Sequence, residues 1–427
     1  MFLKTRAALI AISLSLVSAV AYAAPGTLAF TGARIIDGTE NAPIENGVLI
    51  SIDGKISNVG SAANVTIPDD AEIVDLQGKT IMPGLINTHG HVGQVLGLEN
   101  GHYDRGNVLR QLALYARYGI TMVNSLGDDE YEGFQIRNDL NPYSLNYSRL
   151  MVAGPVLAPR TTEQAVRAVN GVADQNADFI KIRVDDNLGR TAKMAPEIYQ
   201  AIADESEKRG IPLAVHAYNL EDAKATLAAG ADFIAHSVRD QEVDQEFIDA
   251  LISSQVCYTP TLTREVSTFI YESEPAFFND PFFTKEVSSE IMTTLNDPER
   301  QARVQNSETA QHYKNHALPM AMHNLKVLSD AGVSIVMGTD SGPAARFQGY
   351  FEHLEMSMMV DAGMSPSAVI QSATSVAAKC LGLDDLGTLE EGKWADIVVL
   401  ERNPLDDINN TQSLSDVWIA GNRVPRD

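Results

Sequence analysis

Two histidines, one residue apart, end the first long apolar segment of the chain. His89 and His91 close the apolar run of residues 80–88, which has the composition of a buried strand. Because successive side chains of a strand point to opposite faces, residues two positions apart share a face. Two neutral imidazoles on one face can supply two ligands to a transition-metal ion such as Zn²⁺. The pair therefore indicates a metal site at the end of a strand.

Four more chemically active residues lie at or near the C-terminal ends of later apolar runs. They are Lys181, His216, His236 and Asp340. Considered alone, each has a structural alternative: Lys181 could reach solvent, His236 could be a core histidine and Asp340 could begin a turn. Their shared position at strand ends favours one common site.

Eight short apolar runs alternate with amphipathic stretches through the middle of the chain. The runs are residues 80–88, 120–123, 150–153, 179–182, 213–216, 233–236, 256–259 and 333–337. Helical periodicity lies between them, for example over 162–174, 195–209 and 220–229. Eight strand–helix units predict an α/β fold, a (β/α)8 TIM barrel over residues 83–382, with functional side chains at the C-terminal strand ends.

The two chain ends have a different pattern. Residues 24–82 and 383–427 alternate short β-type runs with turn sequences such as Asp37-Gly38. Neither end supplies a sheet that would be stable alone. We therefore expect one small β-sandwich domain built from both ends.

Residues 1–23 have the layout of a secretory signal peptide. Lys4 and Arg6 precede an apolar stretch that ends in Ala21-Tyr22-Ala23, a small-x-small cleavage pattern. The stretch is short for a membrane span. We expect cleavage near Ala23, no stable membrane anchor and an exported, periplasmic protein.

The charge of the chain limits its partners. Acidic residues outnumber basic ones 56 to 32, which gives a net charge of −24. Nucleic-acid phosphates and anionic membrane surfaces would repel such a chain. We expect a small-molecule substrate, and a homo-oligomer stays an open alternative.

The chain has two cysteines. Cys257 lies in a predicted strand and Cys380 in an Ala-rich predicted helix. Because neither belongs to a dense cysteine framework, we expect two buried free thiols rather than a disulfide.

Taken together, the motifs resemble those of the amidohydrolase superfamily, and within it the imidazolonepropionase-like and prolidase-like metal-dependent hydrolases. The matching pieces are residues 83–91, Lys181, His216-Ala217-Tyr218, His236, residues 338–341 and residues 387–396. They span nearly the whole mature chain.

The resemblance implies a site for two divalent metal ions, with Zn²⁺ preferred. His89, His91 and Asp340 would hold the more buried ion, and His216 and His236 the second. Lys181, carboxylated by CO₂, would bridge the two ions. The chemistry requires that modification because a lysine ammonium offers only hydrogen-bond donors and would repel two cations.

The resemblance also implies amide hydrolysis by a metal-bridging hydroxide. Asp340 would act as general base and then acid, and Tyr218 would donate to the developing oxyanion. N-acyl amino acids, dipeptides or related small amides would be the substrates. Two alternatives stay open: the same site acting on an ester, lactone or cyclic imide, and a non-catalytic binding protein. The complete set of six ligands argues against the second.

Two side chains are candidates for substrate binding. Lys224, six residues after Tyr218, could hold a substrate carboxylate, although a lysine lacks the bidentate fork of an arginine. His102 could reach the substrate, although a solvated loop histidine is the simpler interpretation. Residues 123–125 read Val-Asn-Ser where relatives often have Val-Arg-Asp, which argues against a strict dipeptidase.

Residues 261–317 form a long insertion that is rich in aromatic side chains. Such insertions are commonly functional, so this one could be a lid over an apolar pocket. The alternative is a helical excursion that packs on the barrel or on a second subunit. We expect the helical histidines within and after it to be structural: His312, His316, His323 and His353.

Overall fold

The structure is a computed structural model that describes residues 26–426. The expected signal peptide, residues 1–23, lies outside the described residues. Within the described part, no helix combines the length and the apolar character that a membrane crossing requires.

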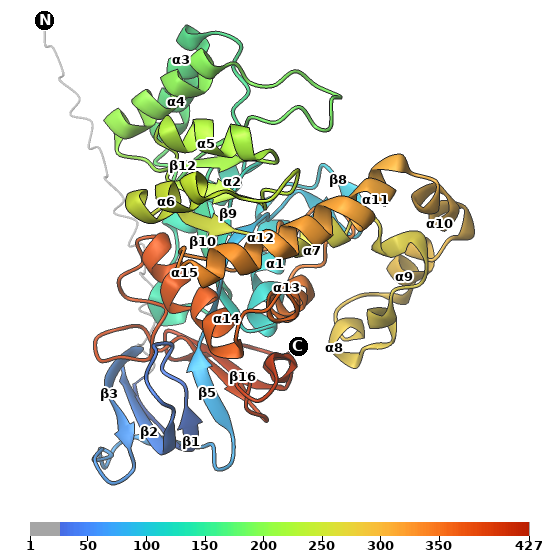
Figure 1. The fold of residues 1–427 in the computed structure, drawn as a ribbon. Coiled ribbons are helices and arrows are strands. Elements are labelled where there is room, and N and C mark those ends of the chain that lie inside the picture. The colour runs from blue at the N-terminus through green and yellow to red at the C-terminus, as the bar shows by residue number, and fades with distance from the viewer. Residues whose placement is uncertain (1–25, 427) are drawn as a thin grey trace, which may run out of the picture.

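Parallel strands form the centre of the molecule (Figure 1). One sheet has the order β10-β9-β6, and a second has the order β11-β12-β13-β14. Their bounds are β6 (Leu85–Gly90), β9 (Ile120–Ser125), β10 (Arg149–Val152), β11 (Ile180–Arg183), β12 (Leu213–His216), β13 (Phe233–Ala235) and β14 (Cys257–Thr259). Every pairing within these two sheets is parallel.

Isolated parallel bridges connect the two sheets. Leu157 pairs with Ile182, which joins the segment after β10 to β11. Residues 333–341 lie between β14 and β6, because Ile335 pairs with Tyr258 and Ser341 pairs with Gly90. The predicted strand at 333–337 is therefore not a regular strand but an extended segment held by single bridges. The whole arrangement is a TIM-barrel-like α/β fold.

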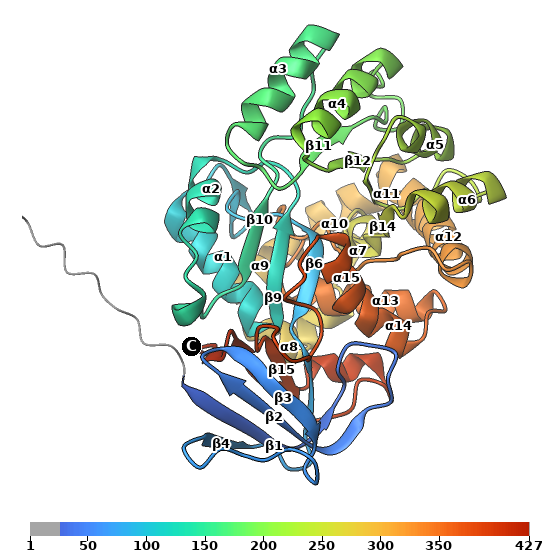
Figure 2. The ribbon, with the colours of Figure 1, turned by 90° about the vertical axis from the view of Figure 1, so that its left-hand side faces the viewer.

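Helices cover these strands on the outside (Figure 2). Those that follow successive strands are α1 (Arg105–Arg117), α2 (Tyr131–Asn138), α3 (Thr162–Ala173), α4 (Pro196–Arg209), α5 (Leu220–Ala228) and α6 (Gln245–Ser254); a short hairpin, β7 (Val95–Leu96) and β8 (Glu99–Asn100), precedes α1. Asp104 and Thr161 cap the amides at the start of α1 and α3. Gly210, in the left-handed conformation, ends α4. The predicted helices 162–174, 195–209 and 220–229 are confirmed to within one residue.

The two chain ends meet in one mixed sheet of eight strands. The N-terminal strands are β1 (Thr27–Ile35), β2 (Ile44–Ile52), β3 (Lys55–Ser61), β4 (Glu72–Asp75) and β5 (Thr80–Pro83); the C-terminal ones are β15 (Ile397–Leu400), β16 (Leu414–Ile419) and β17 (Asn422–Arg423). Antiparallel pairing of β5 with β15 joins the two ends. Phe30, Ile81 and Trp418 contribute to its core. The division of this sheet into two sandwich layers stays a prediction.

The long insertion is a chain of short helices that lies beside the central strands (Figure 1). Its elements are α7 (Leu262–Val266), η2 (Ile270–Glu272), η3 (Ala276–Asn279), α8 (Pro281–Thr284), α9 (Ser289–Leu295), α10 (Pro298–Gln305), α11 (Glu308–His312) and the π-helix η4 (Tyr313–Ala317). The rings of Phe277 and Phe283 are buried against Tyr350, with centroids 5.3 and 5.1 Å away. These aromatic side chains therefore form core packing instead of the lining of an open apolar pocket.

Four helices complete the fold after the insertion. They are α12 (Leu318–Asp330), α13 (Tyr350–Asp361), α14 (Pro366–Ser372) and α15 (Ser375–Cys380); two further 3-10 turns are η1 (Pro142–Ser144) and η5 (Ile408–Gln412).

The prediction of two free thiols is wrong. Cys257 on β14 and Cys380 at the end of α15 form a disulfide, with their Cα atoms 6.1 Å apart. Cys257 packs in the same apolar cluster as Ala377 and Ala378, so α15 lies directly against the strand. The sequence could not reveal this contact, because 123 residues separate the two cysteines.

Candidate metal centre

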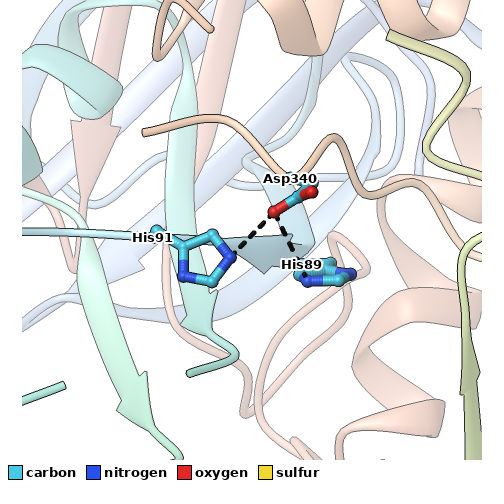
Figure 3. A group of neighbouring side chains, drawn as sticks. All are labelled: His89, His91 and Asp340. Atoms are coloured by element: carbon cyan, nitrogen blue, oxygen red, sulfur yellow. Dashed lines mark hydrogen bonds and ion pairs between the residues drawn. The ribbon is translucent and has the colours of Figure 1, made fainter. Parts of the chain in front are cut away.

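Three of the six predicted ligands form a compact group (Figure 3). His89 lies on β6, His91 follows its end, and Asp340 lies on the bridged segment beside it. The Nε2 atoms of His91 and His89 are 2.8 and 3.8 Å from Asp340 Oδ1. One ligand atom from each residue falls within 4.8 Å of the others. This is the donor set and the spacing that a transition-metal ion needs.

The backbone holds this group together. The Asp340 amide donates to the His89 carbonyl over 2.6 Å, and the Thr339 amide donates to the same oxygen over 3.1 Å. The His89 amide donates to Asn87 Oδ1. The backbone hydrogen bonds of Thr339 and Asp340 to His89 therefore hold Asp340 beside the end of β6.

Two further predicted ligands stand next to this group. The ring centroid of His236 is 4.7 Å from that of His89 and 4.1 Å from that of His216. His216 ends β12 and His236 follows β13. The structure thus brings four histidines into one continuous cluster.

The amine of Lys181 completes the cluster. Lys181 lies on β11, is 3% exposed, and its Nζ has no hydrogen-bond partner among the described residues. Burial lowers the pKa of this amine to about 7. Its charge in turn contributes to the lowered pKa values of His89, His216 and His236. Its strand, β11, pairs with β12, which ends at His216.

Burial sets the protonation of the second pair of histidines. It lowers the pKa of His216 to about 3, although the neighbouring carboxylate of Asp185 opposes the shift. It also lowers the pKa of His236 well below its ordinary value. Both imidazoles are neutral at physiological pH, which is the form that binds metals.

Asp340 is held ionised. Burial opposes its charge, but Arg346 and the hydrogen bond from His91 outweigh burial, and its pKa lies well below the ordinary value. Arg346 Nη1 lies 2.6 Å from Asp340 Oδ2. The carboxylate therefore faces His91 with one oxygen and Arg346 with the other.

Contacts with neighbouring groups orient the rings of His91 and His216. His91 Nδ1 donates to the Gly127 carbonyl over 2.9 Å, and His216 Nε2 lies 2.9 Å from Asp185 Oδ2. The first contact turns Nε2 of His91 towards Asp340 Oδ1, and the second leaves Nδ1 of His216 free. Asp185 is not among the predicted residues; its only signal in the sequence is its place four residues after Lys181, beyond the end of the same strand.

Tyr218 is in contact with the insertion. Its hydroxyl lies 2.6 Å from Nε2 of His312, and the guanidinium of Arg239 stacks on its ring at 4.5 Å. Tyr313 packs edge-on against the same ring. A histidine that we expected to be only structural thus hydrogen-bonds a candidate catalytic residue.

The two predicted substrate-binding residues lie outside this cluster. The Lys224 amine is 2.6 Å from Asp244 and also pairs with Glu246, at the start of α6. His102 is partly exposed, with Nε2 3.7 Å from Glu99. Neither side chain lines the cavity of about 480 Å³ that adjoins His91, and their roles stay predictions.

The lining of that cavity is acidic. It includes Asp128, Asp129 and Glu130, together with Gln94 and His91. Asp129 is buried, and burial raises the pKa of its carboxyl to about 7. The lining thus places three acidic residues in the same cavity as the candidate ligand His91, beside apolar residues such as Val95 and Pro155.

The residues fit a divalent metal ion at His89, His91 and Asp340. The donor set consists of imidazole nitrogens and one carboxylate, which suits Zn²⁺ and similar ions. Buried polar atoms without hydrogen-bond partners in the described chain, Lys181 Nζ and His89 Nδ1, lie within the cluster. An unpaired buried amine is costly, and conversion to a metal-bound carbamate would remove that cost.

The sequence is similar to those of known proteins. Residues 80–424 match the model of the Amidohydrolase family. The 5-methylthioadenosine/S-adenosylhomocysteine deaminase of Bacillus thuringiensis (strain Al Hakam) is 23% identical over 430 residues, and 90% of each chain is covered.

Solved structures show the same fold. A proposed prolidase from Bifidobacterium longum is 25% identical, with a TM-score of 0.75 over 94% of this chain and 95% of that one. A Xaa-Pro dipeptidase with bound methionine is 22% identical, with a TM-score of 0.74 over 93% of this chain and 99% of that one.

Proposed function

Since this chain belongs to the amidohydrolase family, we propose that it is a binuclear metal-dependent hydrolase of small amides, such as N-acyl amino acids or dipeptides. The chain is a hydrolase that acts on C–N bonds. The finer assignment rests on one observation. The amine of Lys181, on the strand that pairs with the one ending at His216, is buried without a partner among the described residues.

The free ring nitrogens define the proposed ligands. His89, His91 and Asp340 would hold one ion, the histidines through Nε2. His216 would hold the second ion through Nδ1, because Asp185 faces its Nε2. His236 would join it through Nε2, because Nδ1 is 2.7 Å from Thr261 Oγ1. Carboxylated Lys181 would be the anionic bridge.

Asp340 is suited to move a proton. When bound, two divalent ions would lower the pKa of a water molecule and polarise a substrate carbonyl. Asp340 is ionised and can accept the proton of the attacking water, then return it to the leaving amine. Arg346 holds the other carboxylate oxygen and so fixes the direction of that transfer.

Tyr218 would stabilise charge on the carbonyl oxygen. If the Nε2–H of His312 donates to the phenol oxygen, the phenol proton is free to point at the substrate. Arg239 beneath the ring and Tyr313 at its edge limit the ring's movement.

The test is metal content followed by turnover. Purified protein would be loaded with Zn²⁺, with and without bicarbonate, and assayed on N-acyl amino acids, Xaa-Pro and other dipeptides, aryl esters and lactones. About two ions per chain with amide cleavage supports the proposal. Two ions with ester or lactone turnover only would replace it by the ester or lactone alternative. A chain that stays free of metal, with unmodified Lys181, would overturn it.

We propose further that the mature protein is exported. The disulfide between Cys257 and Cys380 supports this, because such bonds persist in oxidising compartments. Mass spectrometry of protein from fractionated cells should find a chain that begins after Ala23 and lacks free thiols. A chain that retains residues 1–23 would contradict export.

A further inference from the structure

Thr261 has a backbone conformation that threonine rarely adopts. Its φ and ψ are 47° and 49°, in the left-handed region. For a β-branched residue this conformation is a genuine outlier, because the branched side chain crowds the backbone. Thr261 is nevertheless completely buried. A strained residue at such a place persists only where the surrounding structure holds it.

Helix capping does not explain the threonine. Thr261 directly precedes α7, but its side chain makes no capping hydrogen bond. Glu355 of α13 takes that role, because its Oε1 and Oε2 atoms each accept from one backbone amide, of Leu262 and Thr263, both over 2.7 Å. The hydroxyl of Thr261 is therefore free for another partner.

That partner is a proposed metal ligand. Thr261 Oγ1 lies 2.7 Å from Nδ1 of His236, and both atoms are buried. His236 itself has a positive φ of 70°. His236 follows β13 and Thr261 follows β14, and both residues have a positive φ. The hydroxyl of Thr261 and the imidazole of His236 meet where these two strands end.

From this contact we infer that Thr261 is a positioning residue for the second metal ion. The inference rests on the proposed binuclear site. The contact holds the ring of His236 with Nδ1 at the hydroxyl, so that Nε2 would face the metal. With Nδ1–H as the donor to the hydroxyl oxygen, the one proton of the neutral imidazole also stays away from Nε2. The first residue of the insertion is then part of the metal centre.

The test separates the hydroxyl from the backbone strain. Thr261→Val keeps the branched side chain at the same φ and deletes only the hydroxyl. Thr261→Ser keeps the hydroxyl, and Thr261→Gly deletes it while adopting the positive φ without strain. Thr259→Val is the matched control, because Thr259 is equally buried and its hydroxyl has no hydrogen-bond partner in the described part of the chain.

The readout is the affinity of each ion, measured on full-length mature protein by competition with a chelator, together with the absorption spectrum of the Co²⁺-loaded protein. Thr261→Val and Thr261→Gly should bind one of the two ions about 10- to 100-fold more weakly and the other unchanged. Thr261→Ser should remain near wild type, and Thr259→Val should equal it.

Each other outcome overturns the inference in a recognisable way. If Thr261→Val or Thr261→Gly retains both affinities, the hydroxyl does not position His236. If Thr261→Ser is as weak as Thr261→Val, a hydroxyl at this position is not sufficient, and the inference is wrong. The glycine variant decides the case if the valine variant does not fold. A wild-type chain that binds fewer than two ions overturns the binuclear proposal as well, whereas two ions without amide turnover leaves the Thr261 inference intact.

Discussion

Lys181, with its buried amine, is the residue on which the proposed metal centre depends most. An unmodified ammonium in a cluster of imidazoles would be costly, and a carbamate would turn the same side chain into an anionic ligand. We predict that Lys181→Ala loses metal and lowers kcat at least about 100-fold. Because the truncation leaves space for a small carboxylate, added acetate or propionate should restore part of the activity. Atomic absorption and turnover measure both effects; full metal content in the variant would contradict the bridging role.

Tyr218 supplies a second prediction at this scale. Tyr218→Phe should lower kcat by about 10²- to 10³-fold with metal content unchanged, because one donor to the oxyanion is lost. The control is Tyr199→Phe on α4, a partly buried ring outside the cluster, which should behave as wild type. Steady-state kinetics on the best amide of the panel gives the comparison. Equal kcat in Tyr218→Phe and wild type would show that the phenol only packs against the insertion.

The six ligand candidates could be predicted because each lies at or near the C-terminal end of an apolar run and has a side chain that can bind a metal ion, Lys181 after carboxylation. Their supporting residues could not. Asp185, Thr261 and Arg346 lie beyond strand ends, in segments whose course depends on tertiary contacts. Lys224 is a candidate by its spacing from Tyr218; its amine pairs with Asp244 and Glu246, and its role in substrate binding stays a prediction.

At the scale of elements, the disulfide ties β14 to α15 across 123 residues of chain. Closing so long a loop restricts the unfolded chain strongly, and loss of such a disulfide typically costs about 2–5 kcal/mol of stability. We predict that the double variant Cys257→Ala with Cys380→Ala has a lower free energy of unfolding by that amount, measured in guanidinium. A reducing agent should destabilise the wild type similarly and leave the double variant unchanged. An effect of the agent on the double variant would assign the loss to another cause.

Glu355 couples α13 to the start of α7 and should make stability depend on pH. Burial raises the pKa of its carboxyl from 4.5 to about 7, so the folded chain keeps a proton that the unfolded chain releases. Its contribution to stability is therefore complete below pH 4.5 and is lost as the pH rises towards 7. Glu355→Gln should flatten that slope in denaturant unfolding between pH 4.5 and 7. Glu299→Gln, at an exposed site on α10, should keep the wild-type slope, and an unchanged slope in Glu355→Gln would refute the assignment.

Periodicity accounts for the elements that could be predicted. Seven of the apolar runs form parallel strands. Strands that alternate with helices are buried on both faces, so their sequences are apolar throughout. Residues 333–337 have the same composition, but single bridges to Tyr258 and Gly90 replace a regular ladder there. The insertion gave no periodic signal, since its short helices depend on contacts such as Phe283 with Tyr350.

On the scale of the whole molecule, a buried ion pair connects the eight-stranded sheet with the central strands. Arg149 on β10 reaches Asp396, just before β15, with two contacts of 3.1 Å. Asp396 also accepts from the Ala420 amide over 2.8 Å, and the guanidinium of Arg149 lies over the Trp394 ring at 5.3 Å. The Arg149–Asp396 pair therefore connects a strand of the centre with the start of β15 and with the turn between β16 and β17.

Loss of the Arg149–Asp396 pair should destabilise the entire chain. Asp396→Ala leaves Arg149, whose side chain is 13% exposed, without its counter-charge, and loss of one partner of a buried pair costs about 3–5 kcal/mol. We predict a loss of that size in the free energy of unfolding, to which the amide of Ala420 contributes because it also loses its acceptor. Both parts should unfold in one transition. Asp330→Asn breaks the exposed pair with Lys326 and should change stability little. If Asp396→Ala instead melts in two steps, with the metal centre intact after the first, the sheet is an appendage and the central strands hold the site without it.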